Sequence, residues 1–217
     1  MADVIEKEII KIKKFVYRAE YIKALQYANY VLKKFPNNFK LKVNYASILG
    51  DAAEMLSPVK RAEQKKKSIE IMRKLLSEAR WHQKSRELYV LKNEYYWQTA
   101  QHFKQYQLGV REVRASNSSG GYYSQGVGAA WHAYFLAKRG QLKRAIYWAK
   151  ISINAWKNYN KHVPQYYNQY VHWALAYGIL NQQKQMMSML KMAAKLSKKS
   201  LNYREFQEII EFVNNLR

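Results

Sequence analysis

Apolar residues recur at intervals of three and four positions along almost the whole chain of 217 residues, which is the spacing of one face of an α-helix. No run shows the sustained alternation of apolar and polar residues that is typical of a half-buried strand. The pattern predicts an all-α protein, and its short connections predict antiparallel neighbours, so that the helices stack as pairs. The predicted helices lie near residues 3–17, 20–35, 38–54, 59–77, 83–105, 127–139, 141–157, 164–180, 182–198 and 203–215, and 106–115 adds a further turn or two.

Local signals at two predicted helix starts support this division. Ser57 offers a hydroxyl for an N-cap, and Pro58 suits the first helical position because the missing N–H has no partner there in any case. Asn202 with Glu205 three residues later resembles a capping box, which predicts the start of the last helix. Both helix starts are therefore indicated by side-chain chemistry as well as by periodicity.

One segment interrupts the periodic pattern. Residues 116–128, SNSSGGYYSQGVG, form the only stretch rich in Gly and Ser, which predicts a mobile loop. The loop would separate N-terminal helical repeats of mixed charge, residues 1–115, from basic, aromatic-rich repeats, residues 129–217, that end in a polar capping helix. We expect the two parts to form one continuous array.

Residues 19–38 place a small residue at Ala19, an aromatic one at Tyr21, an alanine at Ala24 and a proline at Pro36, and residues 134–153 place Gly140, Ala145 and Ala149 in a similar arrangement. Both resemble the second helix of a tetratricopeptide (TPR) repeat, although their spacings to weaker copies, 44 and 41 residues, exceed the usual length of about 34. The resemblance implies a TPR-like right-handed α-solenoid whose concave groove receives an extended peptide. The residues expected to pack within these repeats are Ala24, Pro36, Gly140, Ala145 and Ala149.

Charge is distributed unevenly along the chain. The formal net charge is +23, and residues 113–204 contain fourteen Lys or Arg residues but no Asp or Glu. The same stretch holds ten Tyr and four Trp residues. A large net charge indicates what a protein binds rather than how it folds, so this region predicts a surface for an anionic partner.

On the predicted helices 141–157 and 182–198, basic residues form stripes beside the apolar stripe. Regular stacking would join the two stripes into one cationic surface. The predicted partner-binding residues are Lys143, Arg144, Lys150, Lys157, Lys184, Lys191, Lys195 and Lys198.

Aromatic residues on the neighbouring helices suggest a second binding feature. Rings at helical spacing are more often part of a core than of a ligand platform, so both interpretations stay open. The candidate platform consists of Tyr134, Tyr147, Tyr166, Tyr170, Trp173 and Tyr177.

Sites for chemistry are not indicated. The chain has no cysteine, which excludes disulfides, thiolate zinc sites and Cys nucleophiles. Its five histidines form no HxxxH or HxH pair, and no carboxylate pair stands out, so we expect no metal, no cofactor and no enzymatic activity.

The sequence therefore predicts a non-enzymatic helical-repeat scaffold or adaptor that binds an acidic protein segment. The alternative is a sequence-tolerant protein that binds nucleic acid, RNA or DNA, such as a component of a large nucleoprotein or virion assembly. Self-association through the acidic final helix is a further option. The start of the chain lacks the apolar run of a secretory signal, and no segment is apolar enough to span a membrane, so we expect a soluble, cytoplasmic protein.

Overall fold

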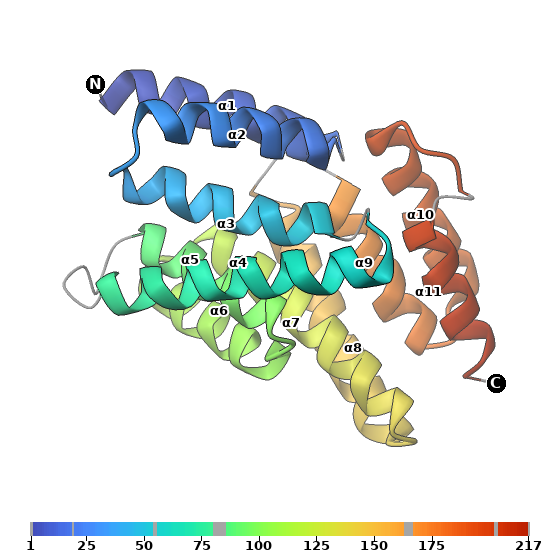
Figure 1. Ribbon diagram of the computed structural model, residues 1–217. Coiled ribbons are helices and arrows are strands. Elements are labelled where there is room, and N and C mark those ends of the chain that lie inside the picture. Colours follow the sequence, from blue (N-terminus) through green and yellow to red (C-terminus); the bar gives the residue numbers. More distant parts are fainter. Residues whose placement is uncertain are drawn as a thin grey trace. The chain divides into compact units, whose positions relative to one another are not determined.

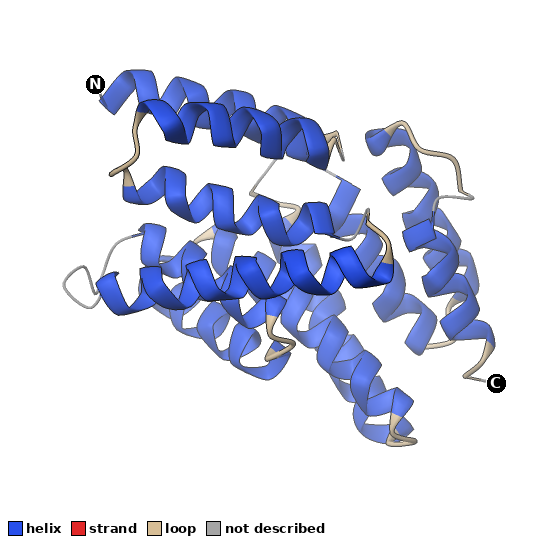
Figure 2. Ribbon diagram, viewed as in Figure 1, coloured by secondary structure: helices blue, strands red, loops and turns tan. Residues whose placement is uncertain are grey.

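The structure is a computed structural model that describes residues 2–18, 20–53, 56–79, 86–162, 167–201 and 204–216, with side chains described from Val4 onward. Across these ranges all regular secondary structure is helical, and no strand is found (Figure 2). The prediction of an all-α protein is confirmed. Two compact units divide the chain, Met1–Ala100 and Gln101–Arg217.

The first unit contains five helices whose packing follows their order in the sequence. They are α1 (Ala2–Tyr17), α2 (Tyr21–Lys34), α3 (Phe39–Ala53), α4 (Pro58–Glu78) and α5 (Arg86–Gln98) (Figure 1). Helix α1 packs against α2 and α3, whereas α3 packs against α2, α4 and α5. Helices α1 and α3 therefore each contact the next helix in the chain and the one after it, which is the packing of stacked helix pairs.

The second unit repeats this scheme. It contains α6 (His102–Ser116), α7 (Ser119–Lys138), α8 (Leu142–Tyr159), α9 (Tyr167–Ile179), α10 (Gln183–Ser197) and α11 (Arg204–Asn214). Helix α7 packs against α6, α8 and α9, and α9 packs against α8, α10 and α11. The prediction of stacked antiparallel helix pairs is confirmed within each unit.

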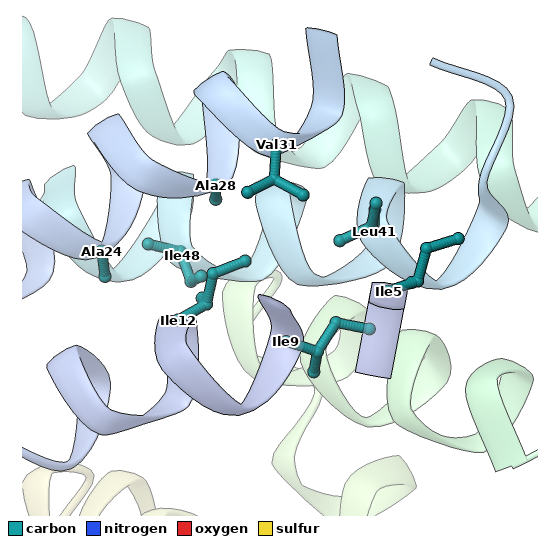
Figure 3. Packing of buried hydrophobic residues seen from close by; sticks show 8 residues of the cluster. All are labelled: Ile5, Ile9, Ile12, Ala24, Ala28, Val31, Leu41 and Ile48. Carbon is teal, nitrogen blue, oxygen red and sulfur yellow. The ribbon is translucent and has the colours of Figure 1, made fainter. Parts of the chain in front are cut away.

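A core of small and branched residues holds the first three helices together. Figure 3 shows this core. Each isoleucine stabilises the fold by about 1.5–3 kcal/mol when it is removed from water, and the alanines of α2 let the helix backbones approach closely. Its buried members are Ile5, Ile9 and Ile12 of α1, Ala24, Ala28 and Val31 of α2, and Leu41 and Ile48 of α3.

The five residues expected to pack within the repeats divide into two groups. Ala24, Ala145 and Ala149 are fully buried, as predicted for helix contacts. Pro36 and Gly140 are exposed and lie in turns between helices, so their place in the repeats is the turn rather than a helix contact. Gly140 has φ +72°, and a Cβ there would meet no neighbouring atom, so glycine is favoured by the turn's left-handed backbone rather than by close packing.

The predicted loop at residues 116–128 is wrong. Helix α7 begins at Ser119, and Ser118 caps it by accepting a hydrogen bond of 3.1 Å from the backbone N–H of Gly121. Asn117, with φ 47°, ends α6 in the left-handed conformation. The connection is therefore reduced to Asn117 and Ser118.

Glycines of α6 and α7 allow these two helices to pack closely. A Cβ on Gly128 would lie 2.6 Å from the backbone nitrogen of Tyr106, and one on Gly109 would lie 2.5 Å from the carbonyl oxygen of Gly121. Both distances are far below the usual contact of about 3.5–4.0 Å between carbon atoms. The α6 and α7 backbones thus touch directly, and only glycine fits between them.

The predicted helix 83–105 is two helices in its described part. Helix α5 ends at Gln98 and α6 begins at His102, so residues 106–115 belong to a full helix rather than to an extra turn. Ala100 between them has φ 54°, a conformation that costs a residue with a side chain roughly 1–2 kcal/mol. No glycine or proline lies in this turn, so the apolar spacing alone predicts one continuous helix there.

At the other predicted helix starts, Pro58 is the first residue of α4 as expected, but the Ser57 side chain makes no capping hydrogen bond. Asn202 lies outside the described residues, so the capping box is not tested.

Candidate anion-binding cleft

Helix α8 presents a complete polar stripe to solvent. Its apolar side consists of Ala145, Ala149, Ile153 and Trp156, which are all buried. Burial of this side turns the neighbouring stripe outward, since the two are separated by roughly a third of a helical turn. The exposed stripe, called the α8 stripe below, consists of Lys143, Tyr147, Lys150, Asn154 and Lys157.

The α8 stripe borders an open cleft of about 390 Å³ in the second unit. Three elements form it: α8, the end of α9 and the turn that leads into α10. The cleft is lined by Lys150, Ile153, Asn154 and Lys157 from α8, and by Tyr177, Leu180, Gln182 and Gln185. Three residues of the predicted site, Lys150, Lys157 and Tyr177, are thus brought together.

The lining combines three kinds of chemistry. Two ammonium groups supply positive charge, and none of the described residues that line the cleft carries a carboxylate. Three carboxamides, those of Asn154, Gln182 and Gln185, can each donate and accept hydrogen bonds. Ile153 and Leu180 supply an apolar wall. Such a cleft can bind an anionic group together with an adjoining apolar one.

The lysines of α10 are exposed but do not line the cleft. Lys184, Lys191, Lys195 and Lys198 all face solvent, whereas Gln185 is the α10 residue that lines the cleft. One residue along a helix corresponds to a rotation of ~100°, so the α10 lysines point to a different side. The predicted fusion of both stripes into one cationic surface is therefore not seen at this cleft.

Arg144 is also exposed, and it lies outside the cleft lining. Its guanidinium donates a hydrogen bond of 2.8 Å to the side-chain oxygen of Gln141 in the preceding turn. Of the eight predicted basic residues, two therefore line the cleft and the other six are exposed elsewhere on the unit.

Two members of the predicted aromatic platform belong to the core instead. Tyr170 is 3% exposed and Trp173 is 8% exposed. Their helix, α9, is contacted by α7, α8, α10 and α11, so neighbours cover almost all of its surface. The assignment of these two rings to a ligand platform is wrong.

The remaining aromatic candidates lie apart from one another. Tyr134 is partly buried against Phe212, with ring centroids 4.2 Å apart. Tyr147 is 62% exposed on the α8 stripe, and Tyr177 lines the cleft. Tyr166 lies outside the described residues. Of the five described rings, Tyr170, Trp173 and Tyr177 stack in a row, whereas Tyr134 and Tyr147 contact other rings instead.

Sequence reasoning missed Gln182 and Gln185 as lining residues. They follow the turn between α9 and α10 at Leu180 and Asn181, where Asn181 has φ 58°. Uncharged amides in a turn carry no distinctive pattern, so only the fold shows that they face Lys150 and Lys157 across the cleft.

Two buried histidines in the second unit are structural. The indole N–H of Trp131 donates a hydrogen bond of 3.0 Å to Nδ1 of His172. Burial lowers the pKa of His172 to about 3 and that of His102 to about 4, since both rings are removed from water. Both rings are therefore neutral at pH 7. In the described part of the chain, no three His, Cys, Asp or Glu residues come together in a way that could hold a metal ion.

Comparisons with known proteins add no family to this picture. No protein-family model matches the chain, and no curated protein matches its sequence. The TPR resemblance therefore stays a prediction. None of the described helices is long and apolar enough to cross a membrane.

Proposed function

We propose that this chain is a non-enzymatic, TPR-like scaffold that binds an acidic protein segment in the cleft beside α8. The observation that supports this function is the lining of the cleft, which places Lys150 and Lys157 beside three carboxamides and an apolar wall.

The spacing of the two lysines suits a particular arrangement of acidic residues. Lys150 and Lys157 are seven residues apart on α8, which corresponds to about 10 Å along the helix axis. In a segment with polyproline II conformation, which has three residues per turn, acidic side chains at positions i and i+3 lie on the same side and are roughly 9 Å apart. A segment with two acidic residues at this spacing could pair with both lysines at once.

The other lining residues match the remaining parts of such a segment. A peptide backbone offers one donor and one acceptor per residue, and the carboxamides of Asn154, Gln182 and Gln185 provide both. Ile153 and Leu180 would contact an apolar side chain between the two acidic residues. Lysines at an open surface attract charge without demanding one geometry, so the cleft should accept related acidic sequences.

The test compares two charge reversals of equal size. Lys150→Glu/Lys157→Glu changes the cleft, whereas Lys184→Glu/Lys191→Glu changes exposed lysines that do not line it. Fluorescence anisotropy with labelled peptides should show that the first variant loses binding and that the second keeps most of it. A peptide with acidic residues at i and i+3 should bind better than one of the same composition with them at i and i+1. Equal losses in both variants would mean that net charge alone attracts the peptide, and the proposed site would be rejected.

A second candidate function is sequence-tolerant binding of RNA or DNA. The observation that favours it is Tyr147, which is 62% exposed on the α8 stripe between Lys143 and Lys150. Alternating cations and exposed rings are typical of surfaces that bind single strands. A salt titration separates the two candidates, since log affinity for a single strand falls by about 0.7 per phosphate contact for each unit of log salt concentration. An acidic peptide releases fewer condensed counterions and should show a shallower slope.

A further inference from the structure

Five rings from three helices form a second surface of the unit Gln101–Arg217. This ring cluster consists of Phe103 and Tyr106 of α6, His132 of α7, and Tyr147 and Trp148 of α8. None of its members lines the cleft beside α8. The cluster is therefore a separate feature from the proposed peptide site, and the role inferred for it rests on the second candidate function, which it deepens.

Trp148 lies at the centre of the ring cluster. Its ring centroid is 4.9 Å from those of Tyr106 and His132, 5.7 Å from that of Phe103 and 5.9 Å from that of Tyr147. All four neighbours are nearly perpendicular to it, at 86–88°. Such edge-to-face contacts hold aromatic side chains in fixed orientations, so the cluster is preorganised.

Two members of the cluster are widely open to solvent. Phe103 is 42% exposed and Tyr147 is 62% exposed. An exposed apolar side chain by itself is normal, but a contiguous exposed group of rings indicates an interaction surface. The fixed, accessible rings could stack on a flat ligand.

The surroundings of the cluster are cationic. Burial lowers the pKa of His132, and the positive charges of Arg144 and Arg139 lower it further, so both guanidinium groups act on this ring. No Asp or Glu occurs between residues 113 and 204 to neutralise them. Arginine pairs with phosphate through two parallel hydrogen bonds and also stacks on flat rings. The charge of the surface therefore complements a partner that is both aromatic and anionic.

From these observations we infer that the ring cluster binds single-stranded nucleic acid, with unpaired bases stacked on Tyr147 and Phe103 and phosphates bound by Arg139 and Arg144. Every base has a flat π-face, so this binding tolerates sequence. A duplex hides those faces in its own base stack and should bind less well. An apolar protein helix would carry no anionic group to pair with Arg139 and Arg144.

The experiment measures anisotropy of three labelled ligands: an oligothymidine, an abasic deoxyribose-phosphate oligomer of the same length, and a duplex. The wild-type protein should bind oligothymidine about 5- to 150-fold more tightly than the abasic oligomer for each base that stacks. Tyr147→Ala should remove most of this difference while leaving the affinity for the abasic oligomer unchanged. Arg139→Gln/Arg144→Gln should instead weaken binding of both oligomers and make it less sensitive to salt.

Tyr30→Ala is the matched control. Tyr30 lies on α2 in the other unit, is 52% exposed, and has the ammonium group of Lys34 at 4.3 Å from its ring centroid. It resembles Tyr147 in exposure and in its cationic neighbour but lies outside the ring cluster, so its removal should change nothing. Phe103→Ala tests the second stacking ring in the same assay. Phe103→Leu, which keeps apolar packing against Trp148, replaces it if the alanine variant loses its helical circular dichroism.

Three results would overturn the inference. They are equal affinity for oligothymidine and the abasic oligomer, a Tyr147→Ala variant that binds oligothymidine like the wild type, and preferred binding of an aromatic-rich acidic peptide at the cluster. The acidic-peptide assay of the cleft serves as an independent readout. A protein that keeps peptide binding but lacks the base preference would reject the ring-cluster inference alone.

Discussion

Replacing Gly128 by alanine tests the direct contact between the α6 and α7 backbones. The new Cβ would lie 2.6 Å from the backbone nitrogen of Tyr106 and 2.7 Å from the carbonyl oxygen of His102. Neither atom can rotate away, because both belong to the main chain of α6. The two helices would have to separate by nearly 1 Å to restore ordinary contact distances of about 3.5 Å.

Two opposing effects decide the magnitude. Alanine favours a helix interior over glycine by about 1 kcal/mol. Overpacking costs about 1–3 kcal/mol and occasionally more, and a backbone clash belongs to the costly end because no side chain can adapt. We therefore expect the free energy of unfolding of the second unit to fall by about 2 kcal/mol on balance.

Gly50→Ala on α3 provides the matched control. The three atoms nearest to a Cβ at Gly50 all belong to the terminal amide of Gln98, and this flexible end can move aside. The gain in helix propensity, about 1 kcal/mol, should then leave the protein equally or slightly more stable. Urea unfolding followed by circular dichroism and tryptophan fluorescence measures both variants. If Gly128→Ala unfolds at the same urea concentration as the wild type, or at a higher one, the close contact of α6 and α7 is refuted.

Three further predictions concern the second unit. The free energy of unfolding of this unit should fall below pH 6.5, by about 2 kcal/mol at pH 5 for each of His102 and His172, because protons bind these histidines in the unfolded chain but not in the buried rings. Urea unfolding at several pH values checks this. His→Gln variants should make the stability less dependent on pH. Ala145→Leu should lower the melting temperature, since Ala145 is fully buried and overpacking costs roughly 1–3 kcal/mol. Gly126→Ala should destabilise through a 2.5 Å contact with the Trp156 ring, and a double-mutant cycle with Trp156→Phe should show a positive coupling that an independent pair would lack.

Local periodicity by itself determined most of the helices and the exposed side of α8, although it missed the first part of α7 and the division between α5 and α6. Whether a residue lies on the apolar or polar side of a helix depends only on its position relative to residues three and four away. This is why Ala145 and Ala149 are buried while Lys143, Lys150 and Lys157 are exposed. The all-α class and the order of packing follow from the same periodicity and from short connections.

Contacts between residues distant in the chain decided the points on which the sequence misled. Gly126 and Gly128 indicate a loop in composition, yet both lie in α7, where Trp156 and the α6 backbone leave no room for a Cβ. Tyr170 and Trp173 indicate a platform, yet four neighbouring helices cover α9. Sequence alone suggests that a glycine is flexible and that an aromatic ring is accessible to a ligand, because it does not show which residues pack around them.

The cleft and the ring cluster likewise exist only in the folded chain. Lys150 meets Gln182 because the turn after α9 returns the chain to α8, and Trp148 meets Phe103 because α6 and α8 both pack on α7. These pairs are 32 and 45 residues apart in the sequence, beyond the range of any helical period. A single helix determines which of its sides is polar, but the packing of several helices determines which polar and aromatic groups share one surface.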